Sequence, residues 1–318
     1  MHKRVYLLFW AVAMTMCLYQ LSHDNFILDT ITPHFPRSAH CSQTLTRTRA
    51  LVTILTSISS DYATLVQVLG LSISMHSDVD CQVDQILIVP DDVTIAQRDL
   101  DRFKSAGWRV MPLARIPPPA SVNSHTVIHR RHMQCFSKLH VFNMTQYEEV
   151  LFVDADTILC GNVMEVFSHH IPRMRDQGVH LGWVYDVTVA SMNSSFNPGV
   201  MLVRPCSHLS AHLLTSMQEI AFDPSFADQG FLNVVFNTRD PVHAESIHRQ
   251  HYVLPPKFNT MANIPSINQE LWEHVKTDAR IFHFLWMKPT ALFMLPRCAY
   301  MGTLHFCIMW QHIRSRLL

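Results

Sequence analysis

The chain has 318 residues, of which 48% are hydrophobic and 16% charged, and its formal net charge is zero. A chain of this length supports one large domain or two small ones, with a sizeable core. The high apolar content and the balanced charge argue against a disordered chain and against a nucleic-acid-binding surface.

The first 21 residues differ in composition from those that follow. Lys3 and Arg4 precede an uncharged run over 5–21, which at about 1.5 Å per residue just spans a thin bilayer core. A cleavable signal peptide has a shorter apolar run and a small-x-small exit, and a buried helix would not favour Tyr and Trp near its edges. We therefore expect a cytosolic tail over 1–4, a transmembrane signal anchor over 5–21 and a lumenal remainder. This predicts a single-pass type II protein of the Golgi or another secretory-pathway membrane.

Cysteine usage is compatible with a lumenal domain. Seven of the eight cysteines follow the apolar run, and an odd number cannot all pair within one chain. No CxxC motif occurs, so a structural zinc site is not indicated. One or two disulfides are expected, and their pairing cannot be read from the spacing. Two sequons begin at Asn143 and Asn193 and are usable only in the lumen.

The remainder is predicted to contain a polar stem over 22–46, a catalytic domain over 47–300 and a tail over 301–318. Within the domain, β-branched apolar runs alternate with segments of helical spacing. This alternation predicts an α/β fold with a mixed, mainly parallel central sheet and helices on both faces. The expected strands are 51–58, 85–90, 108–113, 149–153, 180–187 and 199–205; the expected helices are 61–76, 94–106, 134–147, 208–221 and 228–237.

Two carboxylates, Asp154 and Asp156, directly follow the apolar strand predicted over 149–153. In parallel sheets, ligands gather at the carboxyl ends of the strands. Two carboxylates this close raise one another's pKa unless a cation lies between them, and carboxylates are suited to Mg²⁺ or Mn²⁺. A solvated turn after the strand is the alternative interpretation, because DxD triplets recur by chance.

Two metal-dependent enzyme classes place DxD after a strand. Haloacid-dehalogenase-like phosphatases use DxDx[TV] after an early strand, whereas here Thr157 comes one position too soon and the strand lies in mid-chain. The other class transfers a sugar from a nucleotide diphosphate. In that class the metal bridges the two phosphates and stabilises the leaving group.

Four segments give the acidic pair a wider context: KLHVFNMTQYEEVLFVDADTILCGNVMEVF (138–167), FNPGVMLVRP (196–205), ADQGFLNVVFN (227–237) and HFLWMKP (283–289). Together, and in this order, they resemble glycosyltransferase family 8, the glycogenin-like family, and the resemblance runs from about residue 51 to residue 289. The resemblance implies a GT-A-type nucleotide-diphospho-sugar transferase fold, a UDP-sugar donor, Mn²⁺, a glycan or protein acceptor, and retention of anomeric configuration.

The resemblance also implies roles for individual residues. Asp154, Asp156 and His283 would bind the metal, with Lys288 at the diphosphate and Tyr62 at the uridine. The other positions that the resemblance places around the donor are Lys138, Asp228 and Gln229 at the catalytic centre, and Asp186 and Asn197 beside the sugar.

Simpler interpretations remain for several of these residues. His283 lies between two phenylalanines and would by itself be read as a core histidine. Tyr62 could be a packing residue, Asp186 a loop cap, and Lys138 a lysine on the surface of a helix.

Three positions depart from the usual pattern of the family. Pro198 replaces a Ser or Thr and lacks a backbone N–H. Trp286 replaces a glycine near the phosphates, where a close backbone approach favours Gly, and Thr290 replaces a tryptophan. These departures support a second hypothesis, a non-catalytic relative that binds nucleotide sugar or glycan.

Overall fold

The computed structural model describes residues 48–55, 59–75, 83–123, 125–127, 130–187, 195–237, 251–290 and 294–317. The expected cytosolic tail, anchor and stem over 1–46 lie outside these residues, as does the sequon at Asn193. Within the described residues, no helix has both the length and the apolar character needed to span a bilayer.

The described strands form one large sheet and one small sheet. The large sheet has seven strands in the order β3-β2-β1-β4-β7-β6-β8, and the small one has three in the order β5-β10-β9. The strands are β1 (Arg49–Ile54), β2 (Asp84–Pro90), β3 (Arg109–Leu113), β4 (Glu149–Val153), β5 (Thr157–Leu159), β6 (Leu181–Tyr185), β7 (Phe196–Val203), β8 (His251–Val253), β9 (Thr260–Met261) and β10 (Ile281–His283).

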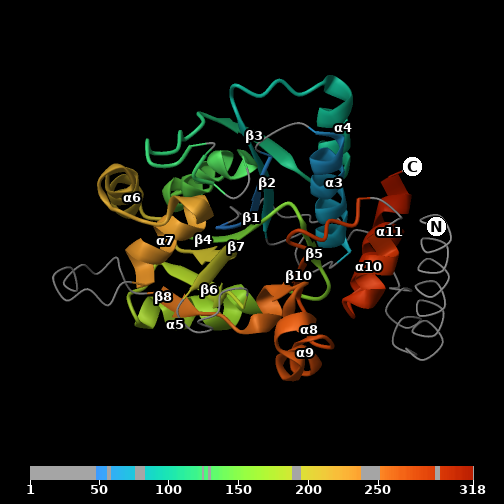
Figure 1. Ribbon diagram of the computed structural model, residues 1–318. Helices are drawn as coiled ribbons and strands as arrows, with labels where there is room; N and C mark the ends of the chain where they lie inside the picture. The colour runs from blue at the N-terminus through green and yellow to red at the C-terminus, as the bar shows by residue number, and fades with distance from the viewer. Residues whose placement is uncertain are drawn as a thin grey trace.

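Helices surround the sheets (Figure 1). The α-helices are α3 (Ser60–Ser74), α4 (Gln97–Ser105), α5 (Ile171–Asp176), α6 (Ser207–Glu219), α7 (Ala227–Asn237), α8 (Ile264–Ile267), α9 (Gln269–Val275), α10 (Leu295–Tyr300) and α11 (Leu304–Arg314). Other helical segments are the 3₁₀ segments η1 (Arg130–Asn143), η3 (Pro224–Phe226), η6 (Pro256–Phe258) and η8 (Ser315–Leu317), and the π-helical turn η2 (Val166–His170).

The large sheet is mixed and mainly parallel, which confirms the prediction. Strands β1, β2, β3 and β4 run parallel to one another, and β6 is parallel to β8. Strand β7 is antiparallel to both β4 and β6. The antiparallel β7 therefore joins the parallel part of the sheet to the β6–β8 edge.

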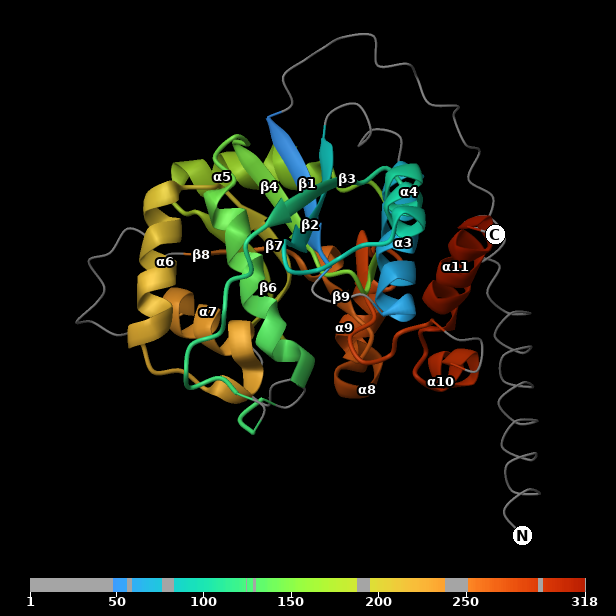
Figure 2. The same cartoon turned by 90° about the horizontal axis from the view of Figure 1, so that it is seen from above.

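A hydrophobic core lies on each face of the large sheet. Along β4, Leu151 and Val153 belong to one core, and Val150 and Phe152 belong to the other. Helices α3 and α11 contribute to the first core, whereas η1, α6 and α7 contribute to the second (Figure 2). Because both faces are covered, β4 is apolar from Val150 to Val153 and lacks the polar alternation of a solvent-facing strand.

The helical segment before β4 differs from its predicted bounds. A helix over 134–147 was expected, and η1 instead spans Arg130–Asn143. The chain turns after Asn143, and the Tyr147 backbone N–H bonds to the Met144 carbonyl at 2.9 Å. The Tyr147 hydroxyl donates to Asp84 at 2.7 Å. This contact with the start of β2 fixes Tyr147 in the turn, and the helical segment ends at Asn143, four residues before the predicted end.

The C-terminal residues pack against the domain. Trp310 of α11 is fully buried in the core that α3 also lines. A disulfide joins Cys298 of α10 to Cys307 of α11. The tail expected from residue 301 thus contributes a helix to the same core.

Replacing Trp310 by Ala should lower the free energy of unfolding by about 3–5 kcal/mol, because it leaves a large cavity in the core. Urea unfolding followed by circular dichroism measures this change. The matched control is Tyr300→Ala, since Tyr300 is 79% exposed and should change the unfolding free energy by no more than about 0.5 kcal/mol. Equal effects of the two variants would contradict the packing of α11.

Candidate active site

The acidic pair lies in a tight turn between β4 and β5. The Asp154 N–H donates to the Gly199 carbonyl at 2.7 Å, which ties the start of the turn to β7. The Thr157 N–H and hydroxyl both donate to the Asp154 carbonyl, at 3.2 and 2.8 Å. The chain therefore turns immediately after the buried strand, as expected, with Asp154 and Asp156 two residues apart in the turn.

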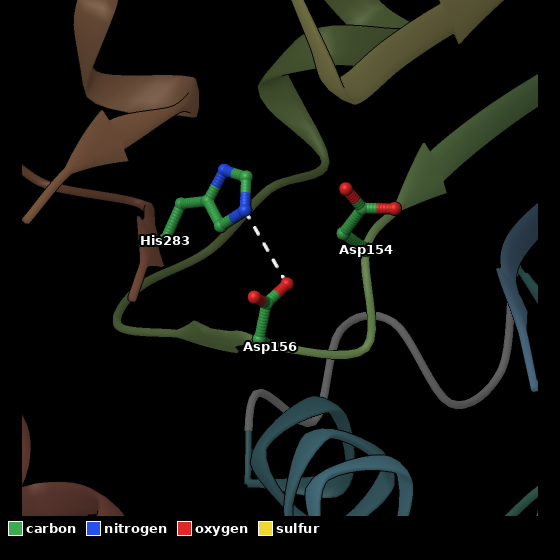
Figure 3. Close-up of side chains that lie close together, drawn as sticks. All are labelled: Asp154, Asp156 and His283. Atoms are coloured by element: carbon green, nitrogen blue, oxygen red, sulfur yellow. Dashed lines mark ion pairs between the residues drawn. The ribbon is translucent and has the colours of Figure 1, made fainter. Parts of the chain in front are cut away.

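A short strand from the C-terminal part of the chain brings His283 to this turn. Strand β10 pairs antiparallel with β5, and His283 lies opposite Thr157. The next residue, Phe284, donates its N–H to the Asp156 carbonyl at 2.9 Å. As Figure 3 shows, the imidazole then faces the Asp156 carboxylate, with Nε2 and Oδ1 separated by 3.3 Å.

Strand β7 is shaped to accept the His283 ring. A β-carbon on Gly199 would lie 2.2 Å from His283 Cε1 and 2.7 Å from Nδ1, so the ring rests where any other side chain would begin. Residues 198–200 fall in a break of the β6–β7 register. Pro198 lies in this bulge, where proline is tolerated, so its missing N–H removes no bond between β6 and β7.

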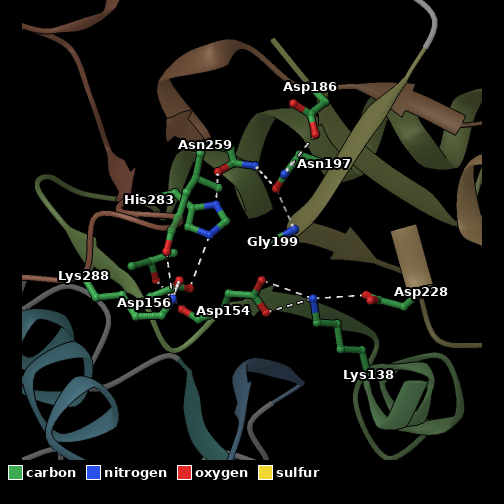
Figure 4. Close-up of polar contacts among 12 residues, drawn as sticks. Lys138, Asp154, Asp156, Asp186, Asn197, Gly199, Asp228, Asn259, His283 and Lys288 are labelled. Atoms are coloured by element: carbon green, nitrogen blue, oxygen red, sulfur yellow. Dashed lines mark hydrogen bonds and ion pairs between the residues drawn. The ribbon is translucent and has the colours of Figure 1, made fainter. Parts of the chain in front are cut away.

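Two lysines neutralise part of the acidic cluster (Figure 4). Lys138 of η1 is buried, and its ammonium lies 3.0 Å from Asp154 Oδ1 and 3.2 Å from Asp228 Oδ2. Lys288 pairs with Asp156 and also donates to the Leu285 carbonyl at 2.8 Å. Lys138 is therefore no surface lysine, because it bridges the acidic turn and the first turn of α7.

The pKa values reflect burial and this pairing. Burial opposes ionisation of Asp156, but the positive charge of Lys288 outweighs it and holds the pKa of Asp156 well below its usual range. Burial likewise disfavours the Lys138 ammonium, but Asp154 and Asp228 raise its pKa well above the ordinary value. Burial raises the pKa of Asp154, against the pull of Lys138 and with the like charges of Asp156 and Asp228 adding to it. Asp154 thus lies where further positive charge would be favourable.

The residues expected beside the sugar form their own hydrogen-bonded group. Asn197 Nδ2 donates to Asp186 Oδ2 at 3.3 Å, and Gln229 Nε2 donates to the same oxygen at 2.7 Å. Tyr62, in the first turn of α3, has its ring centroid 5.5 Å from the Lys288 ammonium. The structure therefore gathers the ten predicted residues around one place, and their individual roles stay predictions.

One buried residue of this region was missed from the sequence. Asn259, between η6 and β9, is fully buried, and its Oδ1 lies 3.0 Å from His283 Nδ1. Its Nδ2 donates to Asn197 Oδ1 at 3.1 Å. Asn259 thus connects the sugar-side group to the acidic turn. Nothing in the KFNTM segment signals this, because the contact depends on tertiary structure alone.

Asp154, Asp156 and His283 fit a divalent cation. Each offers a ligand atom, and these atoms lie within 4.8 Å of one another. Two carboxylates and one imidazole suit Mn²⁺ better than an all-oxygen site would. Taking the imidazole as neutral, the three carboxylates of Asp154, Asp156 and Asp228 exceed the charges of Lys138 and Lys288 by one. Added positive charge is needed before this cluster could attract a diphosphate.

Strained backbone lies at two points of the site. Among the described residues, the non-glycine residues with positive φ are Ala227 (48°) and Leu285 (55°). Ala227 directly precedes Asp228, and Leu285 lies in the turn between His283 and Lys288. Such strain persists where the surrounding structure fixes it, and it clusters at functional sites.

The residue that replaces the family's glycine is turned toward α10. Trp286 is 46% exposed, and the Arg297 guanidinium lies 4.4 Å from its ring centroid. Helix α11 supports the end of the same loop, since Gln311 donates to the Pro289 carbonyl and Arg314 to the Thr290 carbonyl, both at 2.7 Å. The loop that carries Lys288 is therefore held by the C-terminal helices.

Comparison with known proteins supports the resemblance to glycosyltransferase family 8. The model of glycosyl transferase family 8 matches residues 53–289. A glycogenin from Komagataella phaffii is 27% identical over 218 residues, covering 65% of this chain and 50% of that protein. UDP-glucuronate:xylan alpha-glucuronosyltransferase 2 from Arabidopsis thaliana is 29% identical over 154 residues, covering 48% of this chain and 22% of that protein. The chain thus spans half or less of the length of these relatives.

A solved structure shows the fold. The galactosyltransferase LgtC, in complex with donor and acceptor sugar analogs, superimposes with a TM-score of 0.53 at 14% sequence identity. The match covers 84% of this chain and 95% of that one. A GT-A-like glycosyltransferase fold is therefore confirmed for the described domain.

Replacing Gly199 by Ala should displace the His283 ring and weaken Mn²⁺ binding by about tenfold or more, a loss typical when a metal ligand loses its support. The EPR signal of free Mn²⁺ measures this affinity. Gly182→Ala, on the neighbouring strand β6, is the matched control, because its β-carbon would meet the flexible Met174 sulfur at 3.2 Å. Unchanged affinity in the folded Gly199 variant would contradict the role of this close approach.

Proposed function

This chain belongs to glycosyltransferase family 8 and is a glycosyltransferase; from that premise, we propose that it transfers a hexose-type sugar from a UDP-sugar to a glycan or protein acceptor. The transfer retains the anomeric configuration and uses Mn²⁺. The observation that carries the proposal is the meeting of Asp154, Asp156 and His283 within 4.8 Å, beside two lysines that contact the same carboxylates.

Asp154, Asp156 and His283 are the residues that would hold the metal. Bound there, Mn²⁺ supplies Lewis-acid stabilisation of the departing UDP. The raised pKa of Asp154 supports this assignment, because a nearby cation would offset the cost of its buried charge.

The lysines provide fixed positive charge around the leaving group. Lys288 lies on the loop that follows β10, and its ammonium faces both Asp156 and the Tyr62 ring. Lys138 is buried and held by two carboxylates. Both charges are in place before a donor arrives, so they would stabilise the developing phosphate charge without reorganisation.

Retention allows two routes. In one, the acceptor attacks on the face from which UDP leaves. In the other, a carboxylate first forms a glycosyl-enzyme intermediate, which the acceptor then resolves. Asp228 is our candidate for the second route, because it lies in the first turn of α7, directly before Gln229, and shares Lys138 with the acidic turn.

The comparisons support a chemical class of donor and of acceptor. One relative carries UDP-glucuronate in its name and xylan as its acceptor, and another is a glycogenin. Their shared chemistry is sugar transfer, and it supports a UDP-sugar donor here.

We extend the proposal to location. The apolar run over 5–21 after Lys3 and Arg4 supports a type II anchor in the Golgi or another secretory-pathway membrane. The disulfide between Cys298 and Cys307 supports an oxidising lumen for the catalytic domain.

Asp154→Asn should reduce Mn²⁺-dependent turnover by at least about 100-fold, because it removes a charged ligand and its share of leaving-group stabilisation. The measurement is the rate at which UDP is released from a UDP-sugar donor in the presence of Mn²⁺. Asp176→Asn is the matched control, since Asp176 is an exposed carboxylate at the end of α5. Full activity in purified Asp154→Asn would make the metal assignment wrong.

A panel of UDP-sugars assayed for UDP release with Mn²⁺, and again with EDTA, should identify one preferred donor and show activity only with the metal. Such selectivity follows from the sugar-side group of Asp186, Asn197 and Gln229. If no donor in the panel is hydrolysed or transferred while UDP still binds, the chain is a non-catalytic relative. The departures at Pro198 and Trp286 are the reason to include that outcome.

A further inference from the structure

The protonation of His283 decides whether it can bind a cation. A neutral imidazole carries its proton on one nitrogen and a lone pair on the other. Only a lone pair on Nε2, the nitrogen that faces Asp156, would serve as a metal ligand. Two acceptors 3.3 Å apart repel each other unless a positive charge lies near both.

Hydrogen-bond direction along β7 settles where that proton lies. The Gly199 backbone N–H can only donate, and it bonds to the Asn197 side chain at 2.9 Å, so that atom is the oxygen Oδ1. Asn259 approaches the same oxygen at 3.1 Å, and must therefore do so with its Nδ2. The other amide atom of Asn259 is then Oδ1, which lies 3.0 Å from His283 Nδ1 and can only accept. The proton consequently resides on Nδ1.

Burial makes this sequence of bonds obligatory. Asn259 is 0% exposed, and Asn197 and His283 are also buried. Water therefore cannot supply the hydrogen bonds that a reversed Asn259 amide would lose, and a buried amide left unpaired is destabilising. At its far end, Asn197 donates to Asp186, which also accepts from Gln229. The series of hydrogen bonds thus ends in the Gly199 backbone N–H, which can only donate, and in the Asp186 carboxylate, which accepts.

We propose that Asn259 is a positioning residue that holds His283 in the Nδ1–H tautomer and so presents the Nε2 lone pair to the divalent cation. The inference rests on the proposed function for the identity of that cation. The proposal also gives Asn197 a second role. Its oxygen already accepts two hydrogen bonds, from Gly199 and Asn259, so it supports the metal ligand as well as lying on the sugar side.

The first test measures Mn²⁺ binding by EPR in the full chain, without any sugar donor. Asn259→Leu removes the acceptor for His283 and should weaken Mn²⁺ binding by about 10- to 100-fold. Asn263→Leu is the matched control. Asn263 is buried four residues further along the same segment, and its Oδ1 has no hydrogen-bond partner among the described residues. The control should bind Mn²⁺ within about twofold of the wild type.

A second variant separates positioning from general stability. Asn259→Asp keeps an oxygen facing His283 Nδ1 but loses the donor to Asn197. It should unfold more easily than the wild type and still bind Mn²⁺ within about threefold of its affinity. An equal loss of affinity in Asn259→Asp and Asn259→Leu would overturn the inference, because only the leucine variant lacks the acceptor.

The third measurement needs no variant at position 259 and no metal. Nitrogen-15 NMR of the histidine side chains in the metal-free wild type, with the His283 signal assigned by its loss in His283→Gln, should show the proton on Nδ1. A ring that carries a proton on Nε2 and none on Nδ1 would overturn the inference. If the wild type shows Nδ1–H but binds no Mn²⁺, the metal in the proposed function fails while the tautomer assignment stands.

Discussion

The pairing of β10 with β5 is the contact on which the candidate site depends. Strand β5 begins one residue after Asp156, so any strand that pairs with it is placed beside the acidic turn. The register puts His283 opposite Thr157, and the Phe284 N–H then closes onto the Asp156 carbonyl. A shift of one residue would turn the imidazole to the other face of the small sheet, away from the carboxylates. Three backbone-paired residues thus define the geometry of a possible metal centre.

The parts of the fold that follow from periodicity could be predicted from the sequence. Strand β4 is an apolar run between polar residues, and the acidic pair after it marks the carboxyl edge of a parallel strand. Short elements gave no such signal, since β9 and β10 have two and three residues and no period can be recognised in them. His283 was therefore identified through family resemblance rather than from its surroundings, which are those of a core histidine.

Contacts made only in the tertiary structure could not be predicted. Asn259 lies in an irregular segment, and its importance depends on the direction of hydrogen bonds in three other residues. Helices α10 and α11 were not predicted from the sequence, which indicated only a tail over 301–318. Their place became evident only from the burial of Trp310 and from the bonds of Gln311 and Arg314 to the loop that carries Lys288.

The separation of the site along the chain has a consequence for the order of events during synthesis. His283 follows Asp156 by 127 residues, so at roughly 5–20 residues per second the ribosome makes the imidazole about 6–25 s after the carboxylates. Until then the acidic turn exists without β10, and neither His283 nor Lys288 is present to balance it. A metal held by the proposed site would therefore bind only the completed domain and could not guide the folding of its N-terminal half.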